Sequence, residues 1–165
     1  MHHLEVMNMN FNISVTGVPG TGKTTLCKSL GKEGWKILDL NEFALETSCL
    51  EGDIVDLDCL IPKINPHMGA ILDSHYSHLV PSFAVIIMEC SPEILRTRLA
   101  DRRYDKKKIE ENVDCLLSDC IGSECAENYP ENRILRLNSG AEDEISILEK
   151  AVNFISKMEM KHNGT

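Results

Sequence analysis

A glycine-rich stretch near the amino terminus combines the residue types and the spacing of a phosphate-binding loop. Residues 17–25 read GVPGTGKTT, which matches the P-loop pattern G-x-x-x-x-G-K followed by Ser or Thr. Glycine adopts backbone angles that other residues resist, so such a loop can wrap with its N–H groups pointing at one anion. We expect Lys23 to reach the β- and γ-phosphates of a nucleotide and the Thr24 hydroxyl to bind Mg²⁺.

A second group of residues could also hold phosphate. Arg102 and Arg103 precede three consecutive lysines, residues 106–108, in a chain whose formal net charge is −9. A run of charge is usually a solvated helix start. Three lysines at a helix N-terminus oppose the helix dipole, however, and a phosphate ligand would offset that cost. We favour a lid over the phosphates, where cations would hold the negative charge of a transferring phosphoryl group.

A carboxylate ends an apolar run that follows the P-loop. Asp73 comes directly after Ala-Ile-Leu and could cap a strand or lie beside Mg²⁺, and we predict the second role. Two histidines follow in the same loop. By residue type alone, His75 and His78 are ordinary loop residues.

Strand-like and helix-like segments alternate around these residues. Five apolar runs, at residues 11–15, 35–40, 70–73, 83–88 and 134–138, have the character of strands in a parallel sheet covered on both faces. We therefore predict one doubly wound α/β domain over residues 1–165, with a five-stranded parallel sheet in the order 2-3-1-4-5. Its ligand would lie at the carboxyl ends of the strands.

The same pattern predicts where several helices begin. Asn41 and Asp56 are expected to cap two short helices, and Ser91 and Asp105 two further ones. We interpret residues 120–130 as a loop or a frayed helix end.

Composition narrows the function. The net charge of −9 disfavours bare nucleic-acid binding, and no apolar run approaches the length of a membrane span. Seven cysteines, an odd number without a C-x-x-C pair, favour a reducing compartment over a disulfide framework. Three of them recur every five residues, match no zinc pattern and are interpreted as small core or surface residues: Cys115, Cys120 and Cys125. We expect an intracellular, cytoplasmic protein that is also nuclear if its source is eukaryotic.

The remaining choice is between a small kinase and a small ATPase. The chain has no N-K-x-D stretch, which disfavours a GTPase that reads guanine in the usual way. Residues 41–66 are too many for a plain crossover and could form a second substrate pocket, with a lid at about 101–112.

The chain resembles the adenylate kinase isoenzyme 6 family, one of the adenylate-kinase-like P-loop kinases. The resemblance extends from Asn12 to about Ser156. Besides the P-loop, it is carried by ILDSH at 71–75, by CSPEIL at 90–95 and by YDKKKIEEN at 104–112.

That resemblance implies phosphate transfer from Mg²⁺-bound ATP to AMP or another nucleoside monophosphate, together with ATP hydrolysis. It also implies a role in maturation of the small ribosomal subunit through ribosomal protein uS11. We expect a monomer that binds neither nucleic acid directly nor a membrane. The residues implied to contact ATP are Gly20, Gly22, Lys23, Thr24, Thr25, Arg102 and Arg103, with the choice between the two arginines left open. Those implied to be catalytic are Lys23, Asp73, His75 and Arg102. Thr24 and Asp73 are implied to hold the metal.

Two departures from the family pattern affect this expectation. The family has Gly where this chain has Arg103, and its monophosphate-binding helix typically carries an arginine about where this chain has Leu45. No arginine occurs between Met1 and Leu95. We therefore hypothesise weak monophosphate kinase activity. One alternative is an assembly switch, in which nucleotide state sets a binding surface for uS11 with little kinase activity. Another is a kinase of a small metabolite such as shikimate or gluconate.

Overall fold

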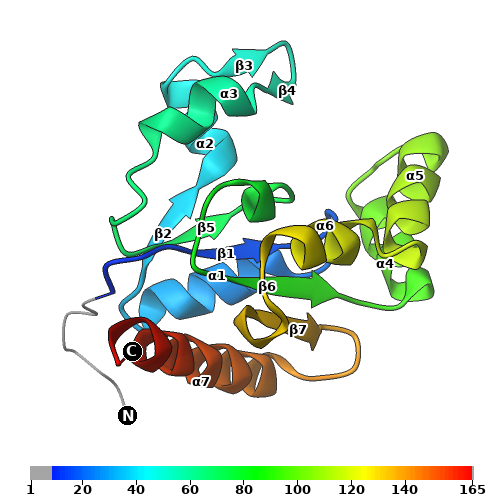
Figure 1. Cartoon of the computed structure of the whole chain (residues 1–165). Helices are drawn as coiled ribbons and strands as arrows, with labels where there is room; N and C mark the ends of the chain where they lie inside the picture. Colours follow the sequence, from blue (N-terminus) through cyan, green and yellow to red (C-terminus); the bar gives the residue numbers. More distant parts are fainter. Residues whose placement is uncertain (1–8, 165) are drawn as a thin grey trace.

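A five-stranded parallel sheet forms the centre of the protein (Figure 1). The computed structural model describes residues 9–164. The sheet has the order β2-β5-β1-β6-β7, and its strands are β1 (Ile13–Thr16), β2 (Lys36–Asp39), β5 (Ala70–Asp73), β6 (Ala84–Glu89) and β7 (Ile134–Asn138). Counted along the chain without the separate hairpin β3–β4, this is the predicted order 2-3-1-4-5. The predicted fold class is confirmed.

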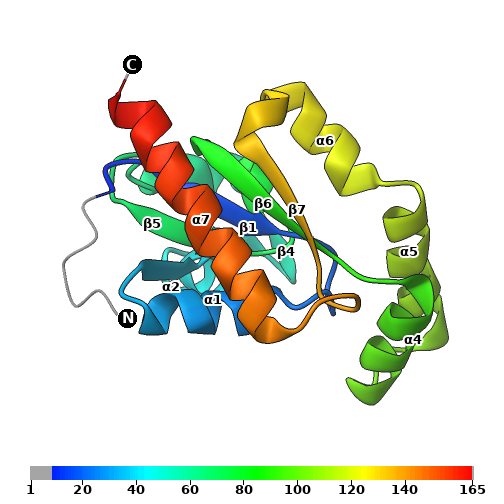
Figure 2. The same ribbon diagram turned by 90° about the horizontal axis from the view of Figure 1, so that it is seen from below.

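Helices cover both faces of the sheet. Helices α1 (Lys23–Lys32) and α7 (Glu144–Asn163) pack side by side on one face (Figure 2). The other face is covered towards β6 by α4 (Pro92–Asp101), α5 (Lys106–Leu117) and α6 (Cys120–Asn128). Alternate side chains of β6 pack on opposite faces of the sheet. Ile86 and Met88 lie in the core beneath α1 and α7, whereas Val85 and Ile87 lie in the core beneath α4–α6. Burial on both faces explains why these strands lack polar alternation.

One segment projects beyond the sheet between β2 and β5 (Figure 1). We call residues 40–63 the arm. It consists of α2 (Leu40–Glu46), a hairpin of β3 (Leu50–Glu51) and β4 (Ile54–Val55), α3 (Leu57–Leu60) and the 3₁₀ helix η1 (Ile61–Lys63). Leu40 and Leu60 are fully buried in a small core with Leu72 of β5, so the arm is anchored at its base. Two further 3₁₀ turns are η2 (Ser77–Leu79) and η3 (Glu131–Arg133).

Most of the predicted helix caps are confirmed. Asp56, Ser91 and Asp105 each accept a backbone N–H of the helix that they precede. The cap predicted at Asn41 is wrong, because Asp39 Oδ1 accepts from the N–H groups of residues 41 and 42 at 3.0 and 3.1 Å. Strand β2 therefore runs directly into α2.

The loop predicted at residues 120–130 is instead mostly the helix α6. Ile121 and Cys125 are its buried residues of helical spacing, and both pack in the α4–α6 core. Two apolar positions are too few to predict a helix from sequence periodicity. Packing of these two side chains in the α4–α6 core stabilises the helix.

The cysteines also depart from expectation, because two pairs are bonded. Cys49 is bonded to Cys59 across the base of the arm hairpin, with Cα atoms 5.4 Å apart. Cys115 is bonded to Cys120 across the α5–α6 turn, with Cα atoms 5.2 Å apart. Both spacings suit a disulfide. Three cysteines are free and buried: Cys27, Cys90 and Cys125. None of the helices within residues 9–164 is long and apolar enough to span a membrane.

Candidate active site

The P-loop connects the end of β1 to the start of α1 at the carboxyl edge of the sheet. Its glycines have positive φ angles, 143° at Gly17, 92° at Gly20 and 100° at Gly22, where a side chain would be strained. A Cβ atom at Gly20 would also lie 2.9 Å from Leu95 Cδ1, so the loop packs closely on α4. Both the turn and the close approach require glycine here.

Lys23 lies folded into the centre of this loop. Its Nζ donates to the carbonyl oxygens of Gly17 at 2.7 Å and Val18 at 3.0 Å. Burial lowers the pKa of Lys23 to about 8, an effect that the Asp73 carboxylate partly opposes. The ammonium group therefore has few compensating charges near it, and phosphate oxygens would satisfy it better than two carbonyls.

Asp73 lies at the carboxyl end of β5, close enough to Lys23 for their charges to interact. Burial raises the pKa of the Asp73 carboxyl, and Lys23 opposes this. The Cys27 thiol of α1 is hydrogen-bonded to the same carboxylate. Thr24 is exposed in the first turn of α1.

The predicted metal ligands can be tested by their chemistry. Thr24 and Asp73 offer only oxygen donors, and no cluster of three or more His, Cys, Asp or Glu residues in the described part of the chain could hold a metal. Mg²⁺ typically takes one or two protein oxygens and fills its remaining positions with water and substrate phosphates. The donors present therefore fit a magnesium ion that arrives with a nucleotide.

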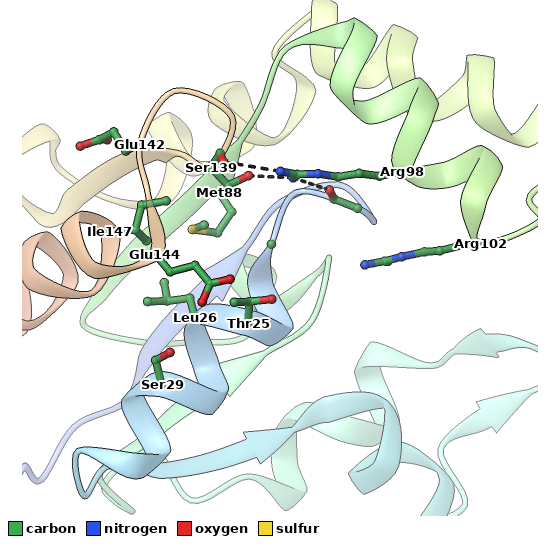
Figure 3. Close-up of a pocket in the computed structure, with 12 residues that line it drawn as sticks. Thr25, Leu26, Ser29, Met88, Arg98, Arg102, Ser139, Glu142, Glu144 and Ile147 are labelled. Carbon is green, nitrogen blue, oxygen red and sulfur yellow. Dashed lines mark hydrogen bonds between the residues drawn. The ribbon is translucent and has the colours of Figure 1, made fainter.

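A cavity of 240 Å³, which we call the first cavity, lies beside the P-loop (Figure 3). Walls from the P-loop, α1, α4 and the β7–α7 loop enclose it, and its lining includes four predicted ATP contacts: Gly20, Gly22, Thr25 and Arg102. Arg103 does not line the first cavity. Of the two lid arginines, only Arg102 lines this cavity.

The backbone explains why the two arginines diverge. Arg103 has φ of 64°, in the left-handed region. The Arg103 N–H donates to the Ala100 carbonyl, and the Tyr104 N–H donates to the Leu99 carbonyl. These two hydrogen bonds form a Schellman motif, which ends α4. Glycine is the usual residue at this position of the motif. The position where the family has Gly is thus one that requires a positive φ.

One arginine of this site was not predicted. Arg98 Nη1 donates to the Gly20 carbonyl at 3.0 Å and to Ser139 Oγ at 2.8 Å, so it ties α4 to the P-loop and to the β7–α7 loop (Figure 3). Ser139 Oγ in turn donates to the Thr21 carbonyl at 2.8 Å. The signal was available, because Arg98 precedes Arg102 by one helical turn and must share its face.

A second cavity, of 510 Å³, lies between the arm and the loop after β5. None of its lining residues is Lys or Arg, and they are Asn41, Leu45, Leu50, Gly52, Asp53, Ile54, Val55, Leu57, His75 and Tyr76. Leu45 and Ile54 are 67% and 73% exposed, unusually high for apolar side chains beside a cavity. Lys63 donates instead to the Thr47 carbonyl at 2.8 Å. The second cavity therefore has mostly apolar walls, and its lining contains neither Lys nor Arg.

The two histidines after Asp73 lie in different surroundings. His75 is exposed on the wall of the second cavity, with its ring edge-on to Tyr76 at 5.1 Å. Partial desolvation of the ring at the cavity wall and the charge of Lys23 lower the pKa of His75, which favours a neutral imidazole at pH 7. His78 is buried instead and bonded through both ring nitrogens, so its interpretation as an ordinary loop residue is wrong.

Known proteins resemble this chain along most of its length. The AAA domain family matches residues 13–119. A Thermoplasma acidophilum protein named "Putative adenylate kinase" is 41% identical over 77% of this chain and 86% of its own length. The adenylate kinase isoenzyme 6 homologue of Saccharomyces cerevisiae is 30% identical over 90% of this chain and 84% of its own length.

Solved structures resemble the fold at lower identity. A gluconokinase from Sinorhizobium meliloti superposes with a TM-score of 0.59 at 14% identity, covering 94% of this chain and 97% of that one. A shikimate kinase from Acinetobacter baumannii gives a TM-score of 0.59 at 14% identity, with 91% and 95% covered. At these identities the likeness concerns the fold alone.

Proposed function

This chain belongs to the adenylate kinase isoenzyme 6 family of P-loop kinase-like proteins, and on that premise we propose that it is an ATP-dependent phosphotransferase with intrinsic ATPase activity. The γ-phosphate of Mg²⁺-bound ATP would pass slowly to AMP or another nucleoside monophosphate, and otherwise to water. The observation that carries this proposal is the contrast between the two cavities. The first has Arg98 and Arg102 in its lining, whereas the second has neither Lys nor Arg.

The side chains around the P-loop suit ATP in the first cavity. Loop N–H groups and Lys23 would bind the phosphates, with Lys23 exchanging its two carbonyl partners for phosphate oxygens. Arg102 would place its guanidinium against the same anion. Thr24 and Asp73 would hold Mg²⁺, which neutralises phosphate charge when it is bound. No covalent intermediate is needed, because positioning and electrostatics carry phosphoryl transfer.

His75 has a position and a charge state that suit the acceptor side. It lines the second cavity, and its lowered pKa keeps a lone pair available on the ring. A neutral imidazole there would accept a hydrogen bond from an attacking water or an acceptor hydroxyl. We assign His75 this positioning of the nucleophile.

The arm makes a monophosphate a poor acceptor. The arm contains a single Lys or Arg residue, Lys63, and six carboxylates. The carboxylates are Glu42, Glu46, Glu51, Asp53, Asp56 and Asp58. This charge repels a dianionic phosphate and leaves water as the competing acceptor.

The same charge supports a second candidate function, an assembly switch that binds ribosomal protein uS11 during maturation of the small ribosomal subunit. In that function ATP turnover would reset the binding surface.

A product assay tests the proposal. The protein is incubated with Mg·ATP, with and without AMP, and ADP and free phosphate are quantified together. We expect ADP and phosphate in nearly equal amounts, with a small excess of ADP when AMP is present. A large excess of ADP with AMP would make it an efficient monophosphate kinase. An absence of ATP consumption would refute both activities.

The same assay separates the small-metabolite alternative. Shikimate or gluconate in place of AMP should leave ADP formation unchanged. The switch is tested by measuring uS11 affinity with ADP and with a non-hydrolysable ATP analogue, and equal affinities would count against it.

A further inference from the structure

A buried chain of polar contacts links the P-loop strand to helix α6 through His78. His78 Nδ1 lies 2.7 Å from Thr16 Oγ1, and Nε2 lies 2.9 Å from Glu124 Oε1. Thr16 is the last residue of β1, directly before the P-loop. The side chain of His78 is 1% exposed, whereas that of Glu124 is 48% exposed. A buried ring thus joins the strand that leads into the P-loop to helix α6.

The partners of the ring indicate which nitrogen donates. A carboxylate oxygen accepts, so Nε2 donates to Glu124 Oε1. Nδ1 then accepts from the Thr16 hydroxyl, and both contacts are satisfied. This order of hydroxyl, imidazole and carboxylate resembles a hydrolytic triad. Thr16 is fully buried, however, so no substrate can reach its hydroxyl and the contacts are structural.

The same loop is fixed at several other points. Ser14 Oγ donates to the Ser77 carbonyl at 2.7 Å, and Ser77 Oγ donates to the Val15 carbonyl at 2.7 Å. Tyr129, which follows α6, donates its hydroxyl to the His78 carbonyl at 3.1 Å. The contacts to β1 fix one side of the loop. The contacts of Glu124 and Tyr129 fix the other side from α6.

The loop held in this way is the one that carries His75. Asp73 ends β5, His75 follows two residues later, and His78 is three residues beyond. Because His75 is exposed and its side chain makes no hydrogen bond within the described residues, its position depends on the backbone to either side. Asp73 fixes the first side through the sheet, and His78 fixes the second.

We propose that His78 and Glu124 are positioning residues that hold His75 at the second cavity and connect this position to helix α6. The inference rests on the proposed function, in which His75 orients the nucleophile. Glu124 is the residue to change, because its side chain lies at the surface. Glu127 provides the matched control, since it is exposed on α6 one turn later and its side chain makes no hydrogen bond or ion pair within residues 9–164.

The experiment compares Glu124→Ala, Glu124→Gln and Glu127→Ala with the wild-type chain. The His75 imidazole resonances, assigned with His75→Asn, are recorded for each folded variant, and ATP turnover is measured in parallel. We expect Glu124→Ala to shift the His75 signals and to lower kcat roughly tenfold with an unchanged KM for ATP, since small misplacements of a reacting group are costly. Glu124→Gln, which keeps an acceptor oxygen, should restore both, and Glu127→Ala should match wild type.

Two results would overturn the inference. One is that Glu124→Ala behaves like Glu127→Ala in both readouts. The other is that kcat falls only in proportion to the fraction of protein folded, with His75 signals in place, which is what a purely structural role predicts. If the wild-type chain consumes no ATP, the proposed function fails, and the His75 signals still decide whether Glu124 sets the position of that ring.

Discussion

At the scale of single residues, Lys23 links charge directly to ligand binding. Its pKa is lowered to about 8 by burial, so the free protein loses this positive charge as pH rises through that value. We expect the affinity for Mg·ATP to be constant near neutral pH and to fall above about pH 8, by at most about tenfold per pH unit. Titration of ATP binding by calorimetry at a series of pH values measures this.

Lys23→Arg is the control for that pH profile. An arginine keeps its charge at every pH used, so its affinity should be lower but independent of pH. A wild-type profile that stays flat to about pH 9.5 would contradict the predicted loss of charge.

Arg103 stores strain that a single substitution should release. A residue other than glycine in the left-handed region costs on the order of 1 kcal/mol, and glycine loses part of this advantage through its greater freedom in the unfolded chain. Because φ at Arg103 is 64°, we expect Arg103→Gly to raise the free energy of unfolding by about 0.5 kcal/mol. Urea unfolding measures it. Arg103→Ala keeps the strain, so equal stability of the two variants would disprove the argument.

Leu45 should determine how well the second cavity accepts a monophosphate. One charge-assisted contact is worth about 1.5–3 kcal/mol, which corresponds to roughly ten- to hundredfold in affinity. We therefore expect Leu45→Arg to tighten AMP binding by that factor in a direct titration. Glu46→Arg is the control, because residue 46 is exposed on the same helix but does not line the second cavity. Tight AMP binding by the wild type, with no gain in Leu45→Arg, would refute the role of Leu45.

At the scale of elements, the two disulfides close loops of different length. Cys49 and Cys59 are 10 positions apart in the sequence, and Cys115 and Cys120 are 5 positions apart. In the chain-entropy account a doubled loop adds about 0.6 kcal/mol, on a typical contribution of about 2–4 kcal/mol. Replacing Cys49 and Cys59 by Ser should therefore destabilise the oxidised protein by about 0.6 kcal/mol more than replacing the other pair. Urea unfolding without reductant compares them, and the reverse order would contradict this account.

The elements also show what sequence could and could not predict. Apolar runs predict all five strands of the sheet. The signal is strongest for the three central strands, β1, β5 and β6, because they are buried on both faces. Asp56, Ser91 and Asp105 are predictable caps, since a cap acts on its own helix. The bonding of Cys49 to Cys59 depends on the β3–β4 hairpin between them, and the burial of His78 depends on contact with the distant helix α6. No local pattern marks them.

Some residues of the candidate site could likewise be predicted from local sequence, whereas others required the structure. The P-loop and the carboxylate at the end of β5 can be placed from sequence, because a parallel sheet brings them to one edge. The choice of Arg102 over Arg103 needed the φ angle at the end of α4. The absence of arginine between residues 1 and 95 was visible in the sequence. That the second cavity has no Lys or Arg in its lining required the fold of the arm.

At the scale of the whole molecule, charge is divided between two parts that project beyond the sheet (Figure 1). Residues 98–108, at the end of α4 and the start of α5, carry six Lys or Arg residues and two Asp residues, whereas the arm carries six carboxylates and Lys63. A nucleotide anion is attracted to the first part and repelled by the second. The two parts should therefore respond to ligands separately, and hydrogen exchange of their backbone amides reports this.

We expect a non-hydrolysable ATP analogue with Mg²⁺ to slow exchange across residues 98–109, where cations would order around the phosphates. AMP added to the wild type should leave exchange in the β3–β4 hairpin unchanged, because the second cavity has no cation to bind its phosphate. AMP added to Leu45→Arg should slow it. If AMP protects the hairpin of the wild type, the acidic arm closes over a monophosphate despite its charge. The protein would then be a monophosphate kinase first and an ATPase second.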